Sequence, residues 1–533
     1  MNPLRAVVTL TRRGVLGPGL PHLQLGQLAA LAGWGLGLAG ELRQAAIRSA
    51  DAVAVIDEDA GPVTYAALLA RAEGVARELR ARGLAPGDRL GLVAHNHVGA
   101  VAVMGGVALL GADLVLLNTG MAAEQVASVC AEQDLSALVH DEELAGSLAS
   151  SRPRGGVALI AEPDLAAAAA LAGPHTRLSP PPRVGRTVVL TSGTTGRPKG
   201  AARRNPAGVG PLVSVVDRIP VRARDTIHIA APLFHTWGYA AFQLALAMRA
   251  TVVLRRRFDP LTARAALVDE SCAALFAVPV MLRRMLDLPP DPRGPIHELT
   301  PNLRVVATSG SALPAGLATR FMDEYGEVLY NLYGSTEASW VSIATPADLR
   351  RDPDTAGTPP RGTVVRIVDD DGRDVAPGRV GQILCGNDFT FEGYTSGSGG
   401  VEARRADALV DTGDLGHQRD GLVFVDGRAD DMVVSGGENV YPAEVENLLQ
   451  DHPAVREVAV CGIPDDEFGQ RLAAFVVLEP GHTLTAEEVR DHVRAHRARH
   501  VVPREVVFVD ALPRNATGKV LVRELCARYV GRA

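Results

Sequence analysis

The sequence of 533 residues has few cysteines, few aromatic residues and no excess of basic residues. Its five cysteines, Cys130, Cys272, Cys385, Cys461 and Cys526, include no C-x-x-C pair, so we do not expect a zinc site. An odd and scattered set is more typical of a reducing cytoplasm than of a disulfide framework. The 54 basic and 61 acidic residues give a net charge of −7, which argues against a nucleic-acid-binding protein.

Basic residues are densest at Arg255-Arg256-Arg257. The favoured interpretation is a solvated strand end, and contact with an anionic ligand is the alternative.

Charge is missing altogether between Gly14 and Gly40. The preceding pair Arg12-Arg13 faintly resembles a twin-arginine signal. Two prolines and several glycines would weaken a membrane-spanning helix in this segment. We therefore expect a helix docked on the protein, with contact to a membrane surface as the second interpretation and a signal or span as the third. No other segment approaches the roughly 20 apolar residues that cross a bilayer.

The order of apolar runs predicts an α/β fold. Between residues 45 and 430, short apolar runs alternate with helix-like stretches, which indicates parallel sheets with crossover helices. The strand-like runs are 88–93, 226–230, 251–254, 275–278 and 304–307. Turn signals between 361 and 386 predict a smaller antiparallel β-unit.

After residue 430 the pattern changes to that of a compact α+β unit. A helix is expected over 441–449, and Thr485 with Glu488 has the spacing of a capping box. The resulting division is an apolar extension at 1–45, a large domain at 46–429 and a small C-terminal domain at 430–533.

The sequence lacks a P-loop, but it has another loop suited to phosphate. Residues 191–200 read Thr-Ser-Gly-Thr-Thr-Gly-Arg-Pro-Lys-Gly and follow the apolar run 187–190. Glycines let backbone N–H groups approach phosphate oxygens, while hydroxyls and a lysine add donors and charge. In a P-loop the lysine follows Gly and precedes Ser or Thr. Here Pro198 precedes Lys199 and Gly200 follows it, so no helix is expected to start there.

Further polar motifs follow strand-like runs. Gly310-Ser311-Ala312 can approach a flat ring or a phosphate. In Asn331–Glu337, Tyr333 offers a stacking face and Glu337 a hard oxygen ligand for Mg²⁺. Asp414 is suited to ribose hydroxyls. Each of these motifs alone is also compatible with an ordinary turn.

Two motifs fall in the C-terminal part of the chain. Asp426–Asp431 lies at the expected domain boundary and is followed by Gly436-Gly437, which could leave a passage for an extended ligand. Lys519 ends the run Pro513–Lys519, from which it can reach an anionic site as a point charge. A charged linker and a surface lysine are the alternatives.

Together and in this order, these motifs resemble the adenylate-forming superfamily of acyl-CoA synthetases, firefly-type luciferases and peptide-synthetase adenylation domains. The resemblance runs from about Asp51 to the C-terminus. It implies two half-reactions and a C-terminal domain that rotates between them. A carboxylate attacks the α-phosphate of Mg·ATP to give an acyl-adenylate and pyrophosphate, and a thiol, commonly that of coenzyme A, then displaces AMP. Such chemistry depends on positioning and on neutralising charge.

The resemblance also implies roles for individual residues. Those implied to bind ATP or AMP are Thr191, Ser192, Gly193, Thr194, Thr195, Gly196, Lys199, Gly310, Ser311, Ala312, Asn331, Tyr333, Gly334, Thr336, Asp414 and Arg428. Those implied to act in catalysis are Lys519, Glu337, Thr336, Lys199 and His235, with Glu337 as the Mg²⁺ ligand. Asp430 matches the hinge, and Gly436 and Gly437 match the coenzyme A tunnel. Candidates for the acyl pocket are His235, Trp237, Gly238, Val278, Pro279 and Met281.

The leading hypothesis is a ligase for medium- or long-chain fatty acids. The chain ends 14 residues after Lys519, which leaves no room for a carrier domain. Amino-acid-activating domains of this superfamily usually have an aspartate in the run 236–242 to hold the α-amino group. This sequence has no acidic residue there, which favours an apolar acyl chain over an amino acid. An aryl- or short-chain-acid ligase and a ligase that loads a carrier protein are the alternatives. We expect a cytoplasmic enzyme. Peripheral membrane contact through residues 14–40 stays the second interpretation, and the oligomeric state is left open between monomer and homodimer.

Overall fold

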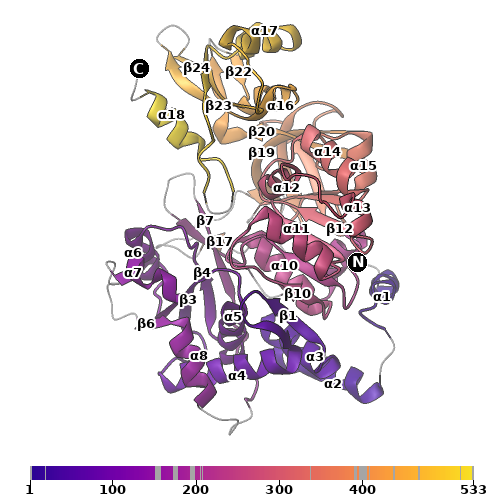
Figure 1. Ribbon diagram of the computed structural model, residues 1–533, viewed down its shortest axis with the longest axis vertical. Coiled ribbons are helices and arrows are strands. Elements are labelled where there is room, and N and C mark those ends of the chain that lie inside the picture. The colour runs from indigo at the N-terminus through magenta and orange to yellow at the C-terminus, as the bar shows by residue number, and fades with distance from the viewer. Residues whose placement is uncertain are drawn as a thin grey trace.

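Two large sheets with helices around them make up the N-terminal two thirds of the chain (Figure 1). The computed structural model describes residues 3–17, 20–149, 158–171, 178–192, 198–203, 206, 208–335, 338–388, 393–394, 405–406, 409–435, 438–465, 469–515 and 518–530.

The first large sheet has eight strands, and its inner pairings are parallel. In spatial order they are β14 (Ser342–Ala344), β13 (Leu329–Tyr333), β12 (Val305–Thr308), β11 (Ala274–Ala277), β9 (Thr226–Ile229), β10 (Thr251–Val253), β1 (Val53–Asp57) and β2 (Gly61–Thr64). Strands β11 and β12 are buried along their whole length, as expected of strands covered on both faces.

The second large sheet has seven strands. They are β17 (Gly393–Tyr394), β8 (Pro198–Arg203), β7 (Thr187–Ser192), β4 (Asp113–Leu116), β3 (Arg89–Val93), β5 (Ala137–His140) and β6 (Ala158–Ala161). β7 and β8 pair antiparallel, so the predicted phosphate loop leads into a strand and not into a helix. The proline before Lys199 is thus the start of β8, which agrees with the expectation from its position.

Helices cover both large sheets. They are α4 (Tyr65–Ala81), α5 (Val98–Leu110), α6 (Ala123–Glu132), α7 (Ala145–Ala149), α8 (Glu162–Leu171), α9 (Gly210–Arg218), α10 (Thr236–Ala247), α11 (Pro260–Asp269), α12 (Pro279–Leu286), α13 (Ile296–Leu299), α14 (Ala315–Tyr325) and α15 (Pro346–Arg351), with the short η1 (Glu142–Leu144). The α/β fold with parallel-rich sheets is confirmed.

The small β-unit is a third, antiparallel sheet. Its strands are β15 (Val364–Val368), β16 (Gly381–Gly386), β18 (Arg405–Ala406), β19 (Leu409–Arg419) and β20 (Leu422–Arg428). It extends well beyond the range 361–386 over which turn signals predicted it. The turn η2 (Ala429–Asp431) follows it, and the predicted domain boundary falls in this turn.

The C-terminal domain is the predicted α+β unit, with apolar clusters of its own. Its elements are β21 (Val433–Ser435), β22 (Glu438–Val440), α16 (Pro442–Gln450), β23 (Val455–Asp465), β24 (Gly469–Leu478), α17 (Ala486–His496), η3 (Arg499–Val501), β25 (Glu505–Phe508) and α18 (Val522–Val530). The capping box of α17 is formed as predicted, because Thr485 Oγ1 accepts from the backbone of Glu488 and Glu488 accepts from the backbone of Thr485.

One expectation about cysteine was wrong. Cys461 on β23 and Cys526 on α18 form a disulfide, whereas Cys130, Cys272 and Cys385 are buried thiols. The two half-cystines are 65 residues apart in sequence, so nothing in their spacing indicated that α18 packs on β23.

The N-terminal extension is docked on the large domain, as the first interpretation predicted. It forms α1 (Pro3–Arg12), α2 (Pro21–Trp34) and α3 (Leu38–Arg48). Arg13 Nε donates to the carbonyl of Val216 over 2.8 Å, and Trp34 is buried with the Arg43 guanidinium 3.9 Å above its ring. Helix α3 crosses the predicted boundary at residue 45 and joins the main core. Across the part of the chain that the structure describes, no helix is both long and apolar enough to span a membrane.

Candidate active site

A cavity of about 2050 Å³ lies between the large and C-terminal domains. The ends of β12 and β13, the β19–β20 hairpin, helices α10 and α12, and the loop that carries Lys519 contribute to its wall. Ligands in open α/β sheets bind beyond the carboxyl ends of the strands, which is where β12 and β13 meet this cavity.

The segments after β12 and along β13 form one side of the cavity. Gly310, Ser311 and Ala312 follow β12, and Asn331, Tyr333 and Gly334 lie at the end of β13; all six line the cavity. Gly334 cannot be replaced without a shift, since a Cβ there would lie 2.1 Å from the carbonyl oxygen of Ser339. The structure therefore brings the predicted adenine-binding residues together.

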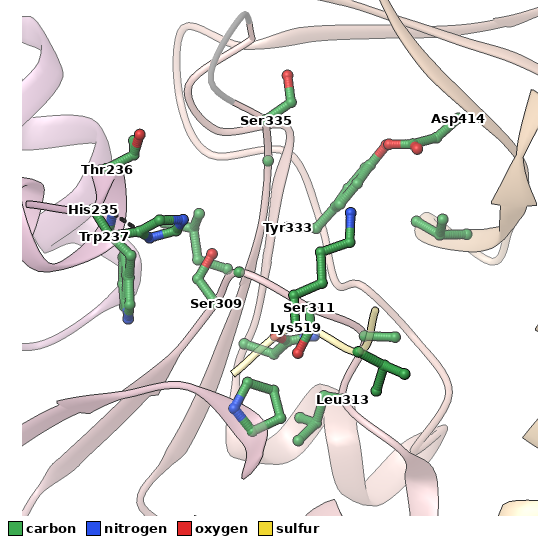
Figure 2. Close-up of a pocket in the computed structure, with 18 of the residues that line it drawn as sticks. His235, Thr236, Trp237, Ser309, Ser311, Leu313, Tyr333, Ser335, Asp414 and Lys519 are labelled. Carbon is green, nitrogen blue, oxygen red and sulfur yellow. Dashed lines mark hydrogen bonds between the residues drawn. The ribbon is translucent and has the colours of Figure 1, made fainter. Parts of the chain in front are cut away.

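Tyr333 and Asp414 are joined by a hydrogen bond. Tyr333 Oη donates to Asp414 Oδ2 over 2.6 Å (Figure 2). Arg428 Nε lies 3.5 Å from the other carboxylate oxygen. Asp414 and Arg428 are register partners in the β19–β20 hairpin. Burial raises the pKa of Asp414, and the Tyr333 hydroxyl, Arg428 and Lys519 oppose this shift. This hydrogen bond fixes the Tyr333 ring against Asp414, the residue proposed to bind ribose. It was not predicted from the sequence.

Lys519 reaches this site from the C-terminal domain. Its side chain extends toward Tyr333 and Asp414 (Figure 2), and its backbone N–H donates to Asn515 Oδ1 over 2.9 Å. The preceding Gly518 has φ +83°, and a Cβ there would lie 2.6 Å from Val280 Cγ1 of α12. A glycine with left-handed φ thus lets the lysine loop press against the large domain.

Further contacts along α12 also hold the two domains together. Arg283 donates to the carbonyl of Arg456 on β23, and Arg456 forms an ion pair with Asp287 at the end of α12. In this arrangement the charge of Lys519 acts on both Asp414 and His235.

His235 is the N-cap of α10 and also faces the cavity. Its Nδ1 accepts from the backbone of Trp237 at 3.5 Å, a long contact. Burial, helped by Lys519, lowers the pKa of His235 to about 4, so the ring is neutral at neutral pH. The residue therefore caps α10 and also forms part of the cavity wall.

The predicted acyl-pocket residues separate into two groups. Trp237 and Pro279 line the cavity, and Trp237 Nε1 donates to the carbonyl of Ala277 over 3.0 Å. Gly238 instead packs against the backbone, since a Cβ there would lie 2.1 Å from the carbonyl oxygen of Pro232. Val278 and Met281 are buried in the main core, and the neighbouring Val280 faces the cavity.

Helix α10 extends the cavity away from His235. Thr236, Ala240, Gln243 and Ala247 are partly exposed and line the cavity, whereas the residues between them are mostly buried. Their spacing of four, three and four residues places them on one face of the helix. Sequence reasoning missed this stripe, although that spacing was visible in the run after His235.

Two family matches cover most of the chain. Residues 42–395 match the family described as AMP-binding enzyme, and residues 444–519 match the AMP-binding enzyme C-terminal domain. The chain belongs to the adenylate-forming superfamily, in its acyl-CoA synthetase family.

Relatives of known activity and structure agree with this assignment. The chain is 35% identical over 482 residues to an indoleacetate–CoA ligase of Aromatoleum aromaticum, covering 87% of this chain and 94% of the relative. It is 29% identical over 477 residues to a long-chain-fatty-acid–CoA ligase of Mycobacterium tuberculosis, covering 88% and 93%. The ATP-bound crystal structure of MatB from Rhodopseudomonas palustris superposes with a TM-score of 0.82 at 28% identity, covering 92% and 99%.

Part of the predicted site of this acyl-CoA synthetase falls outside the residues that the structure describes. Gly193, Thr194, Thr195, Gly196, Thr336, Glu337, Gly436 and Gly437 lie outside the described residues, as do the side chains of Thr191, Ser192, Lys199 and Asp430. In the described backbone, Thr191 of β7 pairs with Lys199 of β8.

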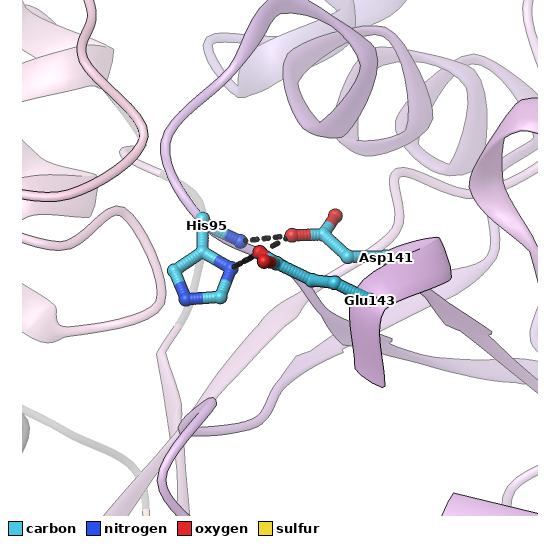
Figure 3. A group of neighbouring side chains, drawn as sticks. All are labelled: His95, Asp141 and Glu143. Carbon is cyan, nitrogen blue, oxygen red and sulfur yellow. Dashed lines mark hydrogen bonds and ion pairs between the residues drawn. The ribbon is translucent and has the colours of Figure 1, made fainter. Parts of the chain in front are cut away.

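A second cluster of ionisable groups lies apart from the cavity. His95 Nδ1 is 2.9 Å from both Asp141 Oδ2 and Glu143 Oε1 (Figure 3), which are ligand types suited to a metal. However, Arg256 also lies 3.1 Å and 3.2 Å from the two carboxylates. Arg257 pairs with Glu143 as well. The arginine run follows the end of β10, and Arg257 is exposed, as the favoured interpretation expected. In addition, Arg256 and Arg257 make ion pairs with residues that follow β5 of the other large sheet.

Proposed function

We propose that this AMP-forming acid–CoA ligase activates a medium- or long-chain fatty acid. The observation that carries the proposal is the continuation of the cavity along α10, beyond the site of the reacting carboxylate. From Thr236 to Ala247 the helix rises about 16 Å at 1.5 Å per residue. Trp237, Leu244 and Leu212 supply apolar wall along this length. An extended acyl chain fits such a cavity better than a short acid does.

In the proposed first step, a carboxylate oxygen attacks the α-phosphorus of ATP and the bond to pyrophosphate breaks. The charge of Lys519 lowers the pKa of both Asp414 and His235, so the lysine is close enough to both to act at this site. It would neutralise charge on the substrate carboxylate and on the phosphate. The neutral His235 would bound the acyl site without competing for that charge. Tyr333, Asp414 and Arg428 would hold the nucleoside.

Bound Mg²⁺ would neutralise charge on the phosphate oxygens. Its proposed ligand is Glu337. Asp414, one of the described carboxylates that line the cavity, is already engaged by Tyr333 and Arg428.

In the proposed second step, the C-terminal domain rotates about Asp430 and withdraws Lys519. The coenzyme A thiol then attacks the acyl carbonyl, and AMP leaves. Gly436 and Gly437 would line the route of the thiol. The contacts of Arg283, Asp287 and Arg456 would have to break in this rotation.

The test is an acid panel. The purified full chain is given ATP, Mg²⁺ and coenzyme A with straight-chain acids from short to long, and AMP and acyl-CoA are measured. Turnover that rises with chain length supports the proposal, and absence of AMP with every fatty acid overturns it. Acyl-adenylate that accumulates while coenzyme A stays unacylated would point to a carrier protein as the acceptor.

An aryl acid is the second candidate. The relative at 35% identity is an indoleacetate–CoA ligase. Phe234, Trp237 and Trp340 line the cavity, and aromatic rings pack well against one another. Benzoates and arylacetates in the same panel decide between the two, since higher kcat/KM for them than for every fatty acid would favour the aryl ligase.

We also propose that the enzyme is cytoplasmic and that its N-terminal helices contact the inner face of the membrane. Leu4 and Val7 on α1 are 76% and 52% exposed, and Leu25 and Leu28 on α2 are 67% and 62% exposed. Each pair has i,i+3 spacing and so shares a helix face. Both helices lie at one edge of the molecule (Figure 1). Arg5, exposed on α1, would favour anionic lipid.

Vesicle co-sedimentation tests this contact. We expect the full chain to bind vesicles with anionic lipid, and a variant with Leu4, Leu25 and Leu28 changed to Gln to lose binding while keeping its activity on soluble acids. Equal binding by both proteins would refute the contact. Deleting residues 1–45 is unsuitable, because it would remove the buried Leu42 and Ala45 of α3.

A further inference from the structure

The far end of the acyl cavity is polar, although its side walls are apolar. The stripe of Thr236, Ala240, Gln243 and Ala247 leads along α10 to two residues of the N-terminal extension that also line the cavity. They are Leu36, between α2 and α3, and Glu41 of α3. Glu41 lies in the first turn of α3 and is partly exposed. Because it lines the cavity, its exposed part faces the cavity.

Hydrogen bonds fix the position of Glu41 independently. Gln44 Nε2 donates to Glu41 Oε2 over 3.1 Å and to the carbonyl of Leu246 over 3.1 Å. Gln27 Nε2 in turn donates to Gln44 Oε1 over 2.8 Å. Glu41 therefore lies beside the C-terminal end of α10, whereas His235 lies at the N-terminal end of the same helix, about 16 Å away by its rise.

The charged and titratable groups around Glu41 are few. Arg249 follows α10, and its guanidinium donates to the carbonyls of Gly14 and Val15 over 3.2 Å and 3.3 Å. Tyr65 of α4 donates its hydroxyl to the carbonyl of Ala250. Burial raises the pKa of Glu41 to about 7, while Gln44 and Arg249 oppose the shift. At neutral pH the carboxyl therefore carries a proton much of the time and can donate as well as accept.

Gln243 adds a second polar group to this end of the cavity. Its side-chain amide makes no hydrogen bond to another residue of the described chain. Buried polar groups in proteins are nearly always hydrogen-bonded, and a group that faces a ligand cavity is completed by water or by the ligand. Glu41 and Gln243 thus offer donors and acceptors where an apolar acyl chain could use none.

We propose that Glu41 and Gln243 form a distal polar subsite that selects extended acids with a hydroxyl or keto oxygen at the end remote from the carboxylate. A hydroxyl can donate to one of the two side chains and accept from the other. The subsite rests on the proposed function, because it requires the reacting carboxylate to lie near His235 and Lys519.

The test compares matched pairs of acids. At about 1.2 Å per bond in an extended chain, 16 Å corresponds to roughly 13 bonds, so the pairs are straight-chain acids of 10, 12 and 14 carbons with and without a terminal hydroxyl. We expect the wild type to prefer the hydroxylated acid in kcat/KM at one of these lengths. In Glu41→Leu that preference should fall by about three- to tenfold, mainly through KM, as expected for one lost hydrogen bond.

Two further variants separate recognition from folding. Glu41→Gln keeps a donor and an acceptor and should retain the preference, and Gln243→Leu should reduce it. Identical hydroxyl-to-methyl ratios in the wild type and Glu41→Leu at all three lengths would overturn the subsite, while turnover of these acids would leave the ligase function intact. Failure to form AMP with any acid, aryl acids included, would instead overturn the proposed function.

Discussion

The contact between Gly518 and Val280 gives a direct measure of the domain arrangement. In Gly518→Ala the new Cβ would lie 2.6 Å from Val280 Cγ1, well inside van der Waals contact. Overpacking of this kind costs about 1–3 kcal/mol, and the left-handed φ of +83° adds about 1–2 kcal/mol for a residue with a Cβ. The φ term applies in every domain orientation, whereas the clash exists only while the lysine loop lies on α12.

We therefore expect Gly518→Ala to slow adenylation, measured by pyrophosphate exchange, by about 5- to 150-fold through the clash alone. Thioester formation from supplied acyl-adenylate should change much less. Val280→Ala removes Cγ1, so the double variant should recover most of the exchange rate, with Val280→Ala alone as the control in a double-mutant cycle. No recovery, or equal loss in both half-reactions, would refute the assignment of this contact to the adenylating arrangement.

The remaining predictions concern the lysine, the distal carboxyl, the acyl cavity and the thiol route. Lys519→Ala should lower pyrophosphate exchange by roughly 10²–10³-fold and spare thioester formation from acyl-adenylate; equal loss in both steps would contradict a withdrawn lysine. Because the pKa of Glu41 is raised from 4.5 to about 7 in the folded state, the free energy of unfolding should decrease as the pH rises between these values and level off above. Glu41→Gln should remove at most about 3 kcal/mol of that decrease, seen as a smaller difference between urea unfolding at pH 5 and at pH 8. Ala240→Phe should restrict turnover to short acids, whereas Ala247→Phe, about 10 Å further along α10, should exclude only long ones; identical chain-length profiles would contradict the path of the cavity. Gly437→Trp should block acyl-CoA formation while pyrophosphate exchange persists, and unimpaired thioester formation would count against its place in the thiol route.

Local sequence patterns predicted β3, β7, β9, β10, β11 and β12 of the large sheets, because each of these strands is a short apolar run between turns. The run around Leu275 and Phe276 is buried throughout and was readable on that ground. The phosphate loop was also readable, since Pro198 in front of Lys199 excluded a helix start. Its partner strand was not, because antiparallel pairing of β7 and β8 depends on tertiary register.

Contacts between distant segments were not predictable. Tyr333 and Asp414 were assigned to adenine and ribose separately, yet they are 81 residues apart and meet only because β13 ends beside β19. Glu41 was not predicted as a site residue, because only the packing of α3 against the end of α10 brings it to the cavity. The sequence motifs indicated how the enzyme uses ATP, whereas the kind of acid could be proposed only from the packing of the helices around the cavity.

The disulfide between Cys461 and Cys526 bears on how the C-terminal domain moves as a unit. It closes a loop of 65 residues that includes Lys519, and a closed loop of that size stabilises a domain by about 4 kcal/mol in the chain-entropy description. That stability does not depend on Arg456, Asp287 or any other contact with the large domain. A domain that is stable by itself can detach from the adenylation site as a rigid body, and Lys519 then leaves with its loop intact and ready for the next molecule of ATP.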